Sequence, residues 1–103
     1  QNTRFSLADM QAQVAVNKAF VAQCTDEYDR GELTAVNASI AKLTTTELQG
    51  VVADKCLQLF GGYGYMQEYP ISRDYVDARI QRIYGGTSEV MKEIIARDLL
   101  GRA

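Results

Sequence analysis

The sequence has 103 residues, 47% of them hydrophobic, and a formal net charge of −2 at pH 7. A chain of this length forms a single small domain with a modest core. Because charges of both signs are scattered along it, a nucleic acid is not expected as its partner, and it has no run of about 18 apolar residues that could span a membrane.

The content of histidine and cysteine limits the chemistry that the chain can support. There is no histidine, which excludes imidazole bases and most zinc sites, and no metal site is expected. Cys24 and Cys56 belong to no CxxC pair. We expect both to be buried thiols in a reducing compartment such as the cytoplasm.

The first predicted helix covers residues 6–29, where apolar side chains recur every three or four positions beside a row of alanines. The stripe consists of Leu7, Met10, Val14, Val21, Cys24 and Tyr28. Asn17 is the one polar residue on it. We expect Asn17 either to fix the register against a neighbouring helix or to lie in water at the helix edge.

A second long helix is predicted over residues 34–60, antiparallel to the first. Gly31 separates the two helices, Thr34 is the expected N-cap, and Gly61-Gly62 stops the helix. Its apolar stripe consists of Val36, Ile40, Leu43, Leu48, Val51, Val52, Cys56, Leu59 and Phe60.

Two shorter helices follow a glycine-rich, aromatic connection. One is predicted over residues 72–84 with Ser72 as its cap, and the other over residues 87–100 with Thr87 and Ser88 able to cap it. The side chains expected to face the core are Val76, Ile80 and Ile83 on the third helix and Val90, Met91, Ile94, Ile95 and Leu99 on the fourth. With no convincing strand pattern, the sequence predicts an all-α, up-and-down helical bundle.

Two turns that contain paired glycines are candidate ligand sites. Exposed backbone at Gly61-Gly62 could approach a flat or charged ligand, with Gln58 one turn earlier. After Gly85-Gly86, the unpaired N–H groups that open the last helix could bind an anion or a carbonyl oxygen. From the residues alone, a helix stop at Gly61-Gly62 and a capped helix start after Gly85-Gly86 are the favoured explanations of the two turns.

The segment from Cys56 to Leu100 resembles the end of the acyl-CoA dehydrogenase family, and the preceding helix pair is similar to the start of that family's C-terminal helical domain. The pieces that carry the resemblance are, in order, Gln58-x-Phe60-Gly61-Gly62, Gly64-Tyr65, Glu68-Tyr69-Pro70, Arg79 and Ile83-Tyr84-x-Gly86-Thr87-Ser88. The family consists of flavoenzymes of fatty acid metabolism that oxidise the Cα–Cβ bond of acyl-CoA thioesters. The resemblance implies that residues 1–103 are one helical domain, a C-terminal piece of a larger flavoenzyme subunit.

The resemblance also implies which residues meet the cofactor FAD and the substrate. The expected FAD contacts are Gln1, Gln58, Leu59, Phe60, Gly61, Gly62, Thr87, Ser88 and Glu89. The stretch that begins at Gln58 is expected to meet the FAD of a neighbouring subunit. Gly86 is expected to contact the substrate.

Partners and location follow from the same resemblance. It implies an acyl-CoA substrate, an electron-transfer flavoprotein or similar electron acceptor, and a homotetramer, in the cytoplasm or, in a eukaryote, the mitochondrial matrix. A further helix precedes residue 1 in the family domain. We therefore expect apolar surface on the first two helices to be exposed and to assemble.

Gly85 departs from the pattern of many family members, which carry the catalytic glutamate at this position. A glycine cannot remove a proton. Long-chain-like and isovaleryl-like members share the glycine and place the base on an earlier helix, so we expect the base upstream of residue 1 and no catalytic residue within this chain. Glu68, Glu89 and Glu93 are expected to be solvated or structural carboxylates. The alternative is a non-catalytic helical assembly module from a divergent homologue.

Overall fold

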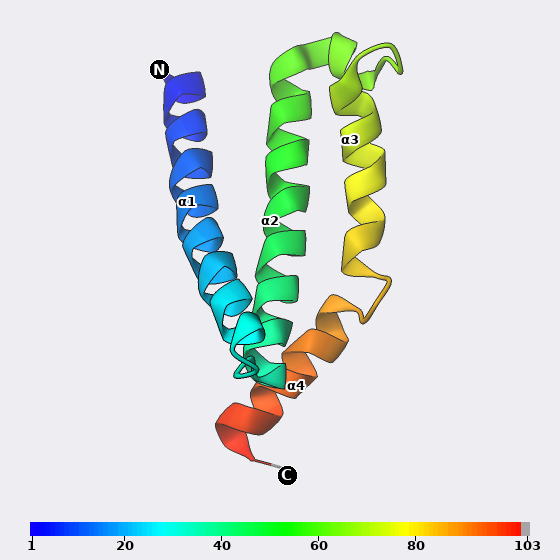
Figure 1. Ribbon diagram of the computed structural model, residues 1–103. Coiled ribbons are helices and arrows are strands. Elements are labelled where there is room, and N and C mark those ends of the chain that lie inside the picture. The colour runs from blue at the N-terminus through cyan, green and yellow to red at the C-terminus, as the bar shows by residue number, and fades with distance from the viewer. Residues whose placement is uncertain (102–103) are drawn as a thin grey trace.

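The computed structural model describes residues 1–101, which form four α-helices and two short 3₁₀ helices. These are α1 (Asn2–Asp29), α2 (Ala35–Phe60), η1 (Gly61–Tyr65), α3 (Pro70–Arg79), η2 (Ile80–Arg82) and α4 (Ser88–Leu100). Successive helices α1, α2 and α3 run in opposite directions beside one another, and α4 lies below α3 against the first half of α2 (Figure 1). The predicted all-α, up-and-down architecture is confirmed.

Two helices begin at the threonine caps that the sequence predicts. The hydroxyl oxygen of Thr34 accepts a hydrogen bond from the N–H of Asn37 at 3.0 Å. Thr87 does the same for the N–H of Val90 at 3.2 Å. Each cap satisfies one of the N–H groups that a helix start leaves without an intrahelical partner.

The predicted bounds of α3 are wrong at both ends. The helix begins at Pro70, with Tyr69 as its N-cap, so Ser72 lies inside the first turn and makes no cap. Proline is well suited to this first position because its missing N–H has no acceptor there in any case. The α-helix ends at Arg79, and the chain then tightens into η2 instead of continuing to Tyr84.

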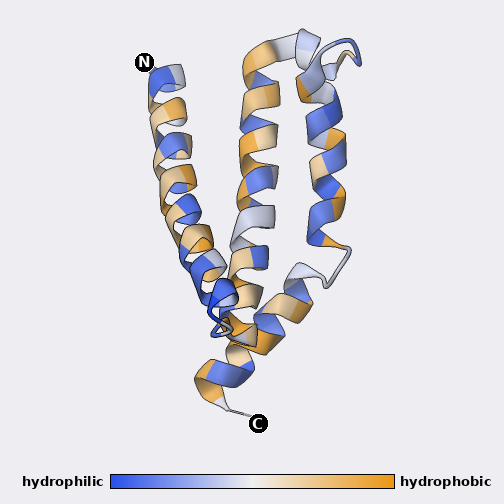
Figure 2. Cartoon of the chain, viewed as in Figure 1, coloured by the Kyte–Doolittle hydropathy of each residue, from blue (hydrophilic) through white to orange (hydrophobic). Residues whose placement is uncertain are grey.

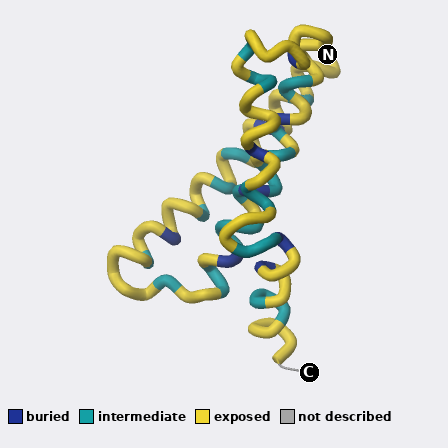
Figure 3. The backbone as a smooth tube through the Cα atoms, turned by 90° about the vertical axis from the view of Figure 1, so that its right-hand side faces the viewer, coloured by how far each residue is buried: buried dark blue, intermediate teal, exposed yellow. Residues whose placement is uncertain are grey.

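The core is built mainly from small side chains. The buried residues are Met10, Cys24, Ser39, Thr46, Ala53, Gly64, Ala78, Ser88 and Met91. No large side chain in residues 1–101 is fully buried. Figure 3 shows the buried positions as single points among exposed and half-buried ones. Small residues on α2 therefore let its neighbours approach closely, while much apolar surface stays uncovered.

Many residues of the predicted stripes are exposed instead of buried. On α3, Ala78 is 4% exposed whereas Val76 is 66% exposed. The other predicted core residues that are exposed are Leu7, Val21, Tyr28, Val51, Leu59, Phe60, Ile80, Ile83, Val90 and Leu99. Apolar and polar segments alternate along all four helices (Figure 2). A periodic stripe identifies an apolar face, but these helices contact too few neighbours within the chain to cover it.

Asn17 is half-buried and joins α1 to α2. Its side-chain amide donates a hydrogen bond to the hydroxyl of Thr44 at 2.9 Å. Of the two expectations for Asn17, this contact supports a residue that fixes helix register.

Candidate functional site

The turn that leads into α4 depends on glycine. Gly85 has φ +65° and Gly86 has φ +108°, both in the left-handed region that side chains disfavour. A Cβ on Gly86 would lie 2.6 Å from the terminal methyl carbon of Met91. The turn therefore packs directly against α4, and a side chain at Gly86 would be both strained and obstructed.

Side chains of α2 hold this turn in place. The Lys42 ammonium group donates a hydrogen bond to the Gly86 carbonyl oxygen. The Glu47 carboxylate accepts a 2.6 Å hydrogen bond from the Ser88 hydroxyl and lies 3.4 Å from Nη1 of Arg82. One face of α2 thus contacts residues before, within and after the glycine pair.

The electrostatic environment keeps Glu47 ionised. The hydrogen bond from Ser88 and the positive charge of Arg82 lower the pKa of Glu47 below its ordinary value of 4.5, although partial burial acts in the opposite direction. Lys92 on α4 adds a further, smaller lowering. An ionised carboxylate is also favoured beside the N-terminus of a helix.

The Arg82 side chain packs across α2 at Gly50. A Cβ on Gly50 would lie 3.4 Å from the guanidinium carbon. The Nε atom of Arg82 is buried, and it has no hydrogen-bond partner among the described residues. The ion pair with Glu47 is therefore the contact that orients this guanidinium group.

The hydroxyl groups that follow the glycine pair are already engaged. Ser88 is 6% exposed and donates to Glu47, while the Thr87 hydroxyl accepts from Val90. Among the described residues, the backbone N–H groups of Ser88 and Glu89 have no acceptor. The ligand-binding capacity of this turn accordingly resides in its backbone N–H groups, which the helix dipole makes good partners for an oxygen atom with negative charge.

The other predicted cofactor contacts lie at the opposite end of the molecule. Gln1 starts α1, and residues 58–62 surround the end of α2; all are exposed. Figure 1 shows both segments at the end away from α4. With a rise of about 1.5 Å per residue, Gly61 lies roughly 20 Å along α2 from Glu47. The structure does not bring the two groups of predicted site residues together within one chain.

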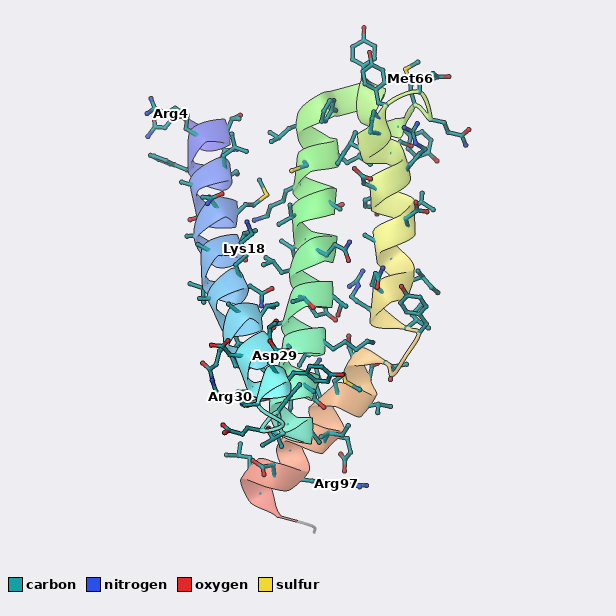
Figure 4. All side chains as sticks on the ribbon, in the orientation of Figure 1. Arg4, Lys18, Asp29, Arg30, Met66 and Arg97 are labelled. Atoms are coloured by element: carbon teal, nitrogen blue, oxygen red, sulfur yellow. The ribbon has the colours of Figure 1, made fainter. Side chains whose placement is uncertain are left out.

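The loop after α2 is stabilised by aromatic and backbone contacts. The ring of Tyr69 lies 5.3 Å from that of Tyr63 and 6.2 Å from that of Phe60. Gly64 is buried, and a Cβ there would lie 2.5 Å from the Leu57 carbonyl oxygen. Met66, labelled in Figure 4, lies within this loop at the end of the molecule away from α4. These contacts hold the loop that contains Gly61 and Gly62 in a fixed conformation at the end of α2.

Two apolar grooves flank α1 and α2. One, of about 570 Å³, lies between α1, α2 and α3 and includes Lys18, which Figure 4 labels on α1. The other, of about 740 Å³, lies on the opposite face and is lined by residues that include Val16, Phe20, Ile40 and Val51. Both grooves are open; charged residues such as Lys18, Asp74 and Asp77 also line the smaller one, and Glu47 lines the larger.

In residues 1–101, no group of three or more His, Cys, Asp or Glu side chains is placed to hold a metal ion. None of the helices described combines the length and the apolarity that crossing a bilayer requires.

Sequence reasoning missed Lys42, Glu47 and Arg82. Glu47 had a detectable signal, because it lies four positions after Leu43 and four before Val51 on the apolar face of α2. A charged residue at such a position indicates a specific partner. Lys42 and Arg82 carry no comparable signal.

The helix arrangement matches that of a known family of C-terminal helical domains. The chain belongs to the acyl-CoA dehydrogenase family: the model of the family "Acyl-CoA dehydrogenase, C-terminal domain" matches residues 1–100. The predicted resemblance, including that to long-chain members, is confirmed.

Relatives and solved structures agree with this assignment. The chain is 48% identical over 100 residues to the mitochondrial long-chain specific acyl-CoA dehydrogenase of Rattus norvegicus, a match that covers 97% of the chain and 23% of the relative. It is similar to the crystal structure of acyl-CoA dehydrogenase from Geobacillus kaustophilus, with a TM-score of 0.95, 43% identity, and coverage of 97% and 26%. The structure of butyryl-CoA dehydrogenase from Megasphaera elsdenii matches with a TM-score of 0.93 and 37% identity, over 97% of this chain and 26% of that chain. The chain therefore spans about a quarter of the length of these proteins.

Proposed function

We propose that this chain is the C-terminal FAD-binding and oligomerisation domain of an acyl-CoA dehydrogenase, which oxidises the Cα–Cβ bond of acyl-CoA thioesters. The observation that carries the proposal is the turn at Gly85-Gly86. Two left-handed glycines bring the chain into α4 with the N–H groups of Ser88 and Glu89 unpaired. Such donors fit the negatively charged and carbonyl oxygens of a flavin nucleotide. When bound, FAD would supply the redox chemistry of the reaction.

Each residue of the turn has a distinct part in this proposal. The N–H groups of Ser88 and Glu89 donate to the cofactor, and Thr87 caps the helix that presents them. Gly86 is proposed to contact the substrate through its backbone. Gly85 leaves space for a catalytic glutamate that the longer subunit supplies. This chain therefore binds and orients, and the proton is removed by a residue outside it.

The exposed segments at the other end of the domain are proposed to serve a second subunit. Gln1 and residues 58–62 are solvent-exposed, and Gly61 lies roughly 20 Å along α2 from Glu47, the α2 residue that contacts the turn. They are thus suited to contact a different FAD molecule from the one at the turn of the same chain. This division requires a homo-oligomer, for which we propose a tetramer, and it fits the extensive exposed apolar surface.

The proposed subunit is larger than this domain, since the relatives that it matches are about four times as long. Electrons are proposed to leave through an electron-transfer flavoprotein or a similar acceptor. A chain in the solved structure of the electron transferring flavoprotein of Acidaminococcus fermentans matches this chain over 27% of its length, with a TM-score of 0.93 and 31% identity. Cys24 and Cys56 are free thiols, which suits a reducing compartment, either cytoplasm or mitochondrial matrix.

A helical assembly module without redox activity is the second candidate. It is favoured by the two open apolar grooves and by the exposed apolar side chains on all four α-helices. Those features fit a domain whose main role is to bind other subunits.

One experiment separates the two candidates. The protein is expressed from its complete coding sequence, purified, and examined for a bound flavin by its visible spectrum. Acyl-CoA thioesters of several chain lengths are then added without oxygen, and flavin reduction is followed by bleaching. Bound flavin that an acyl-CoA bleaches supports the dehydrogenase. A well-folded oligomer without flavin, which gains none on addition of FAD, would overturn it in favour of the assembly module.

A further inference from the structure

A single carboxylate of α2 connects the two sides of the turn before α4. Glu47 contacts Arg82, three residues before Gly85, and Ser88, two residues after Gly86. Its two oxygens are divided between them, Oε1 to Ser88 at 2.6 Å and Oε2 to Arg82 at 3.4 Å. The glycine pair therefore lies between two residues that are bound to the same side chain.

This contact acts on the part of α4 that is proposed to bind FAD. Ser88 is the first residue of the helix, so the hydrogen bond to its hydroxyl restrains the direction of the first N–H groups. A charge-assisted hydrogen bond is short and strongly oriented, and this one is partly buried. Releasing it would let the glycine pair change conformation, because glycine adopts several backbone states at little cost.

We propose that Glu47 is a positioning residue which, through Ser88 and Arg82, holds the N-terminus of α4 in the orientation that binds FAD. The inference rests on the proposed function. It also assigns the Ser88 hydroxyl to Glu47 and leaves only the Ser88 backbone for the cofactor. Glu47 touches neither cofactor nor substrate in this role.

The charges around Glu47 are those that a positioning role needs. The groups that face it are Arg82 from η2, Ser88 from α4 and, at longer range, Lys92 from α4. They keep the carboxylate ionised and able to accept from both sides of the turn. On the same face of α2, Lys42 binds the Gly86 carbonyl oxygen and so restrains the backbone between the two flanks.

The test uses the protein expressed from its complete coding sequence, stripped of flavin and titrated with FAD. The variants are E47A, E47Q, S88A and the double variant E47A/S88A. E47A and S88A are each expected to weaken FAD binding about tenfold, the scale of a lost hydrogen bond to a charged group. The double variant is expected to bind about as weakly as E47A, since both changes remove the same contact.

Two matched controls distinguish positioning from general stability. Ser39 is as buried as Ser88, but its hydroxyl bonds to the Ala35 carbonyl oxygen within α2, so S39A should keep the FAD affinity. The ion pair of Arg30 with Glu32 has a similar distance, 3.3 Å, but lies far from the turn. E32Q should therefore also keep the FAD affinity. Hydrogen exchange at residues 85–90 should accelerate in E47A and S88A and not in the controls.

The outcomes separate the two hypotheses. If the unsubstituted protein binds FAD and the folded variants at Glu47 and Ser88 bind it equally well, the positioning role is wrong and the proposed function stands, even if their melting temperatures fall. If the unsubstituted protein binds no FAD, the proposed function fails and the positioning role fails with it. Should E47A not fold, E47Q and S88A, which alter shape less, decide the result.

Discussion

The Ser88 hydroxyl donates a 2.6 Å hydrogen bond to the Glu47 carboxylate, although the two residues are 41 positions apart in the sequence. This contact joins the middle of α2 to Ser88, the first residue of α4. It gives the glycine turn a fixed relation to α2, which local capping by Thr87 alone cannot do. The predictions below concern this turn, the helix register, and the assembly of the domain.

Substitution of Gly86 should destabilise the fold. We expect G86A to lower the free energy of unfolding by about 1–3 kcal/mol, chiefly because alanine is strained at φ +108°, with a smaller part from the shift of the flexible Met91 side chain that its Cβ would require. Urea denaturation followed by circular dichroism measures the change. G31A is the control, since Gly31 has φ +70° with no atom within 4 Å of a Cβ. An equal loss in both variants would show that packing against Met91 is unimportant.

Glu47 should make stability depend on acid pH. Its pKa is lowered in the folded state, chiefly by the Ser88 hydrogen bond and then by Arg82. The stabilisation is therefore complete above the unfolded-state pKa, near the ordinary 4.5, and is lost as pH falls through the lower folded-state pKa. The difference in unfolding free energy between the chain and E47Q should shrink as pH drops below about 4.5. A difference that stays constant down to full protonation would contradict the contact.

The register contact between α1 and α2 should be measurable as a coupling. We expect N17A to cost about 1 kcal/mol, the typical value of one hydrogen bond, and T44A to remove most of the same energy, so that the double variant is less than additive. T45A is the control, because the Thr45 hydroxyl bonds within its own helix to the Ala41 carbonyl oxygen. Strict additivity of N17A and T44A in urea titrations would assign Asn17 to a solvated helix edge.

The chain should self-associate through the face of α1 and α2 that carries the larger groove. Val16 is 73% exposed and lines that groove, so V16E should shift the molecular mass toward the monomer while helix content stays the same. Light scattering after size exclusion, over a dilution series, measures this. V76E, at a similarly exposed valine of α3, is the comparison. If V76E dissociates the assembly and V16E does not, the interface lies on α3, and a monomer at every concentration rules out self-association.

Residues 1–103 by themselves should be catalytically inactive. With Gly85 at the position of the usual base, the turn itself offers no carboxylate there, and Glu47, which contacts the turn from α2, is held by Ser88 and Arg82. We expect the purified chain neither to retain FAD tightly nor to bleach it in the presence of acyl-CoA. Robust turnover would show that a base exists within these residues.

Local features of the sequence determined the helices and the identity of the turns. The apolar stripes indicated α1, α2 and α4, the caps at Thr34 and Thr87 are confirmed, and Gly61 ends α2 with φ +62° as a helix stop requires. These features depend on residues within one or two turns of each other, so they can be read without knowing the fold. The error at Ser72 arose because Pro70 offered an earlier helix start than the serine.

Tertiary structure alone decided what each apolar face meets. Val76 and Ala78 lie on the same short helix, and only packing against α2 made the alanine buried and the valine exposed. The same is true of the candidate site, where Glu47 and Ser88 meet because α4 lies across α2. The geometry of helix packing determines which long-range partner a side chain meets. The periodicity of the sequence shows only which face of each helix is apolar, not which helix packs against it.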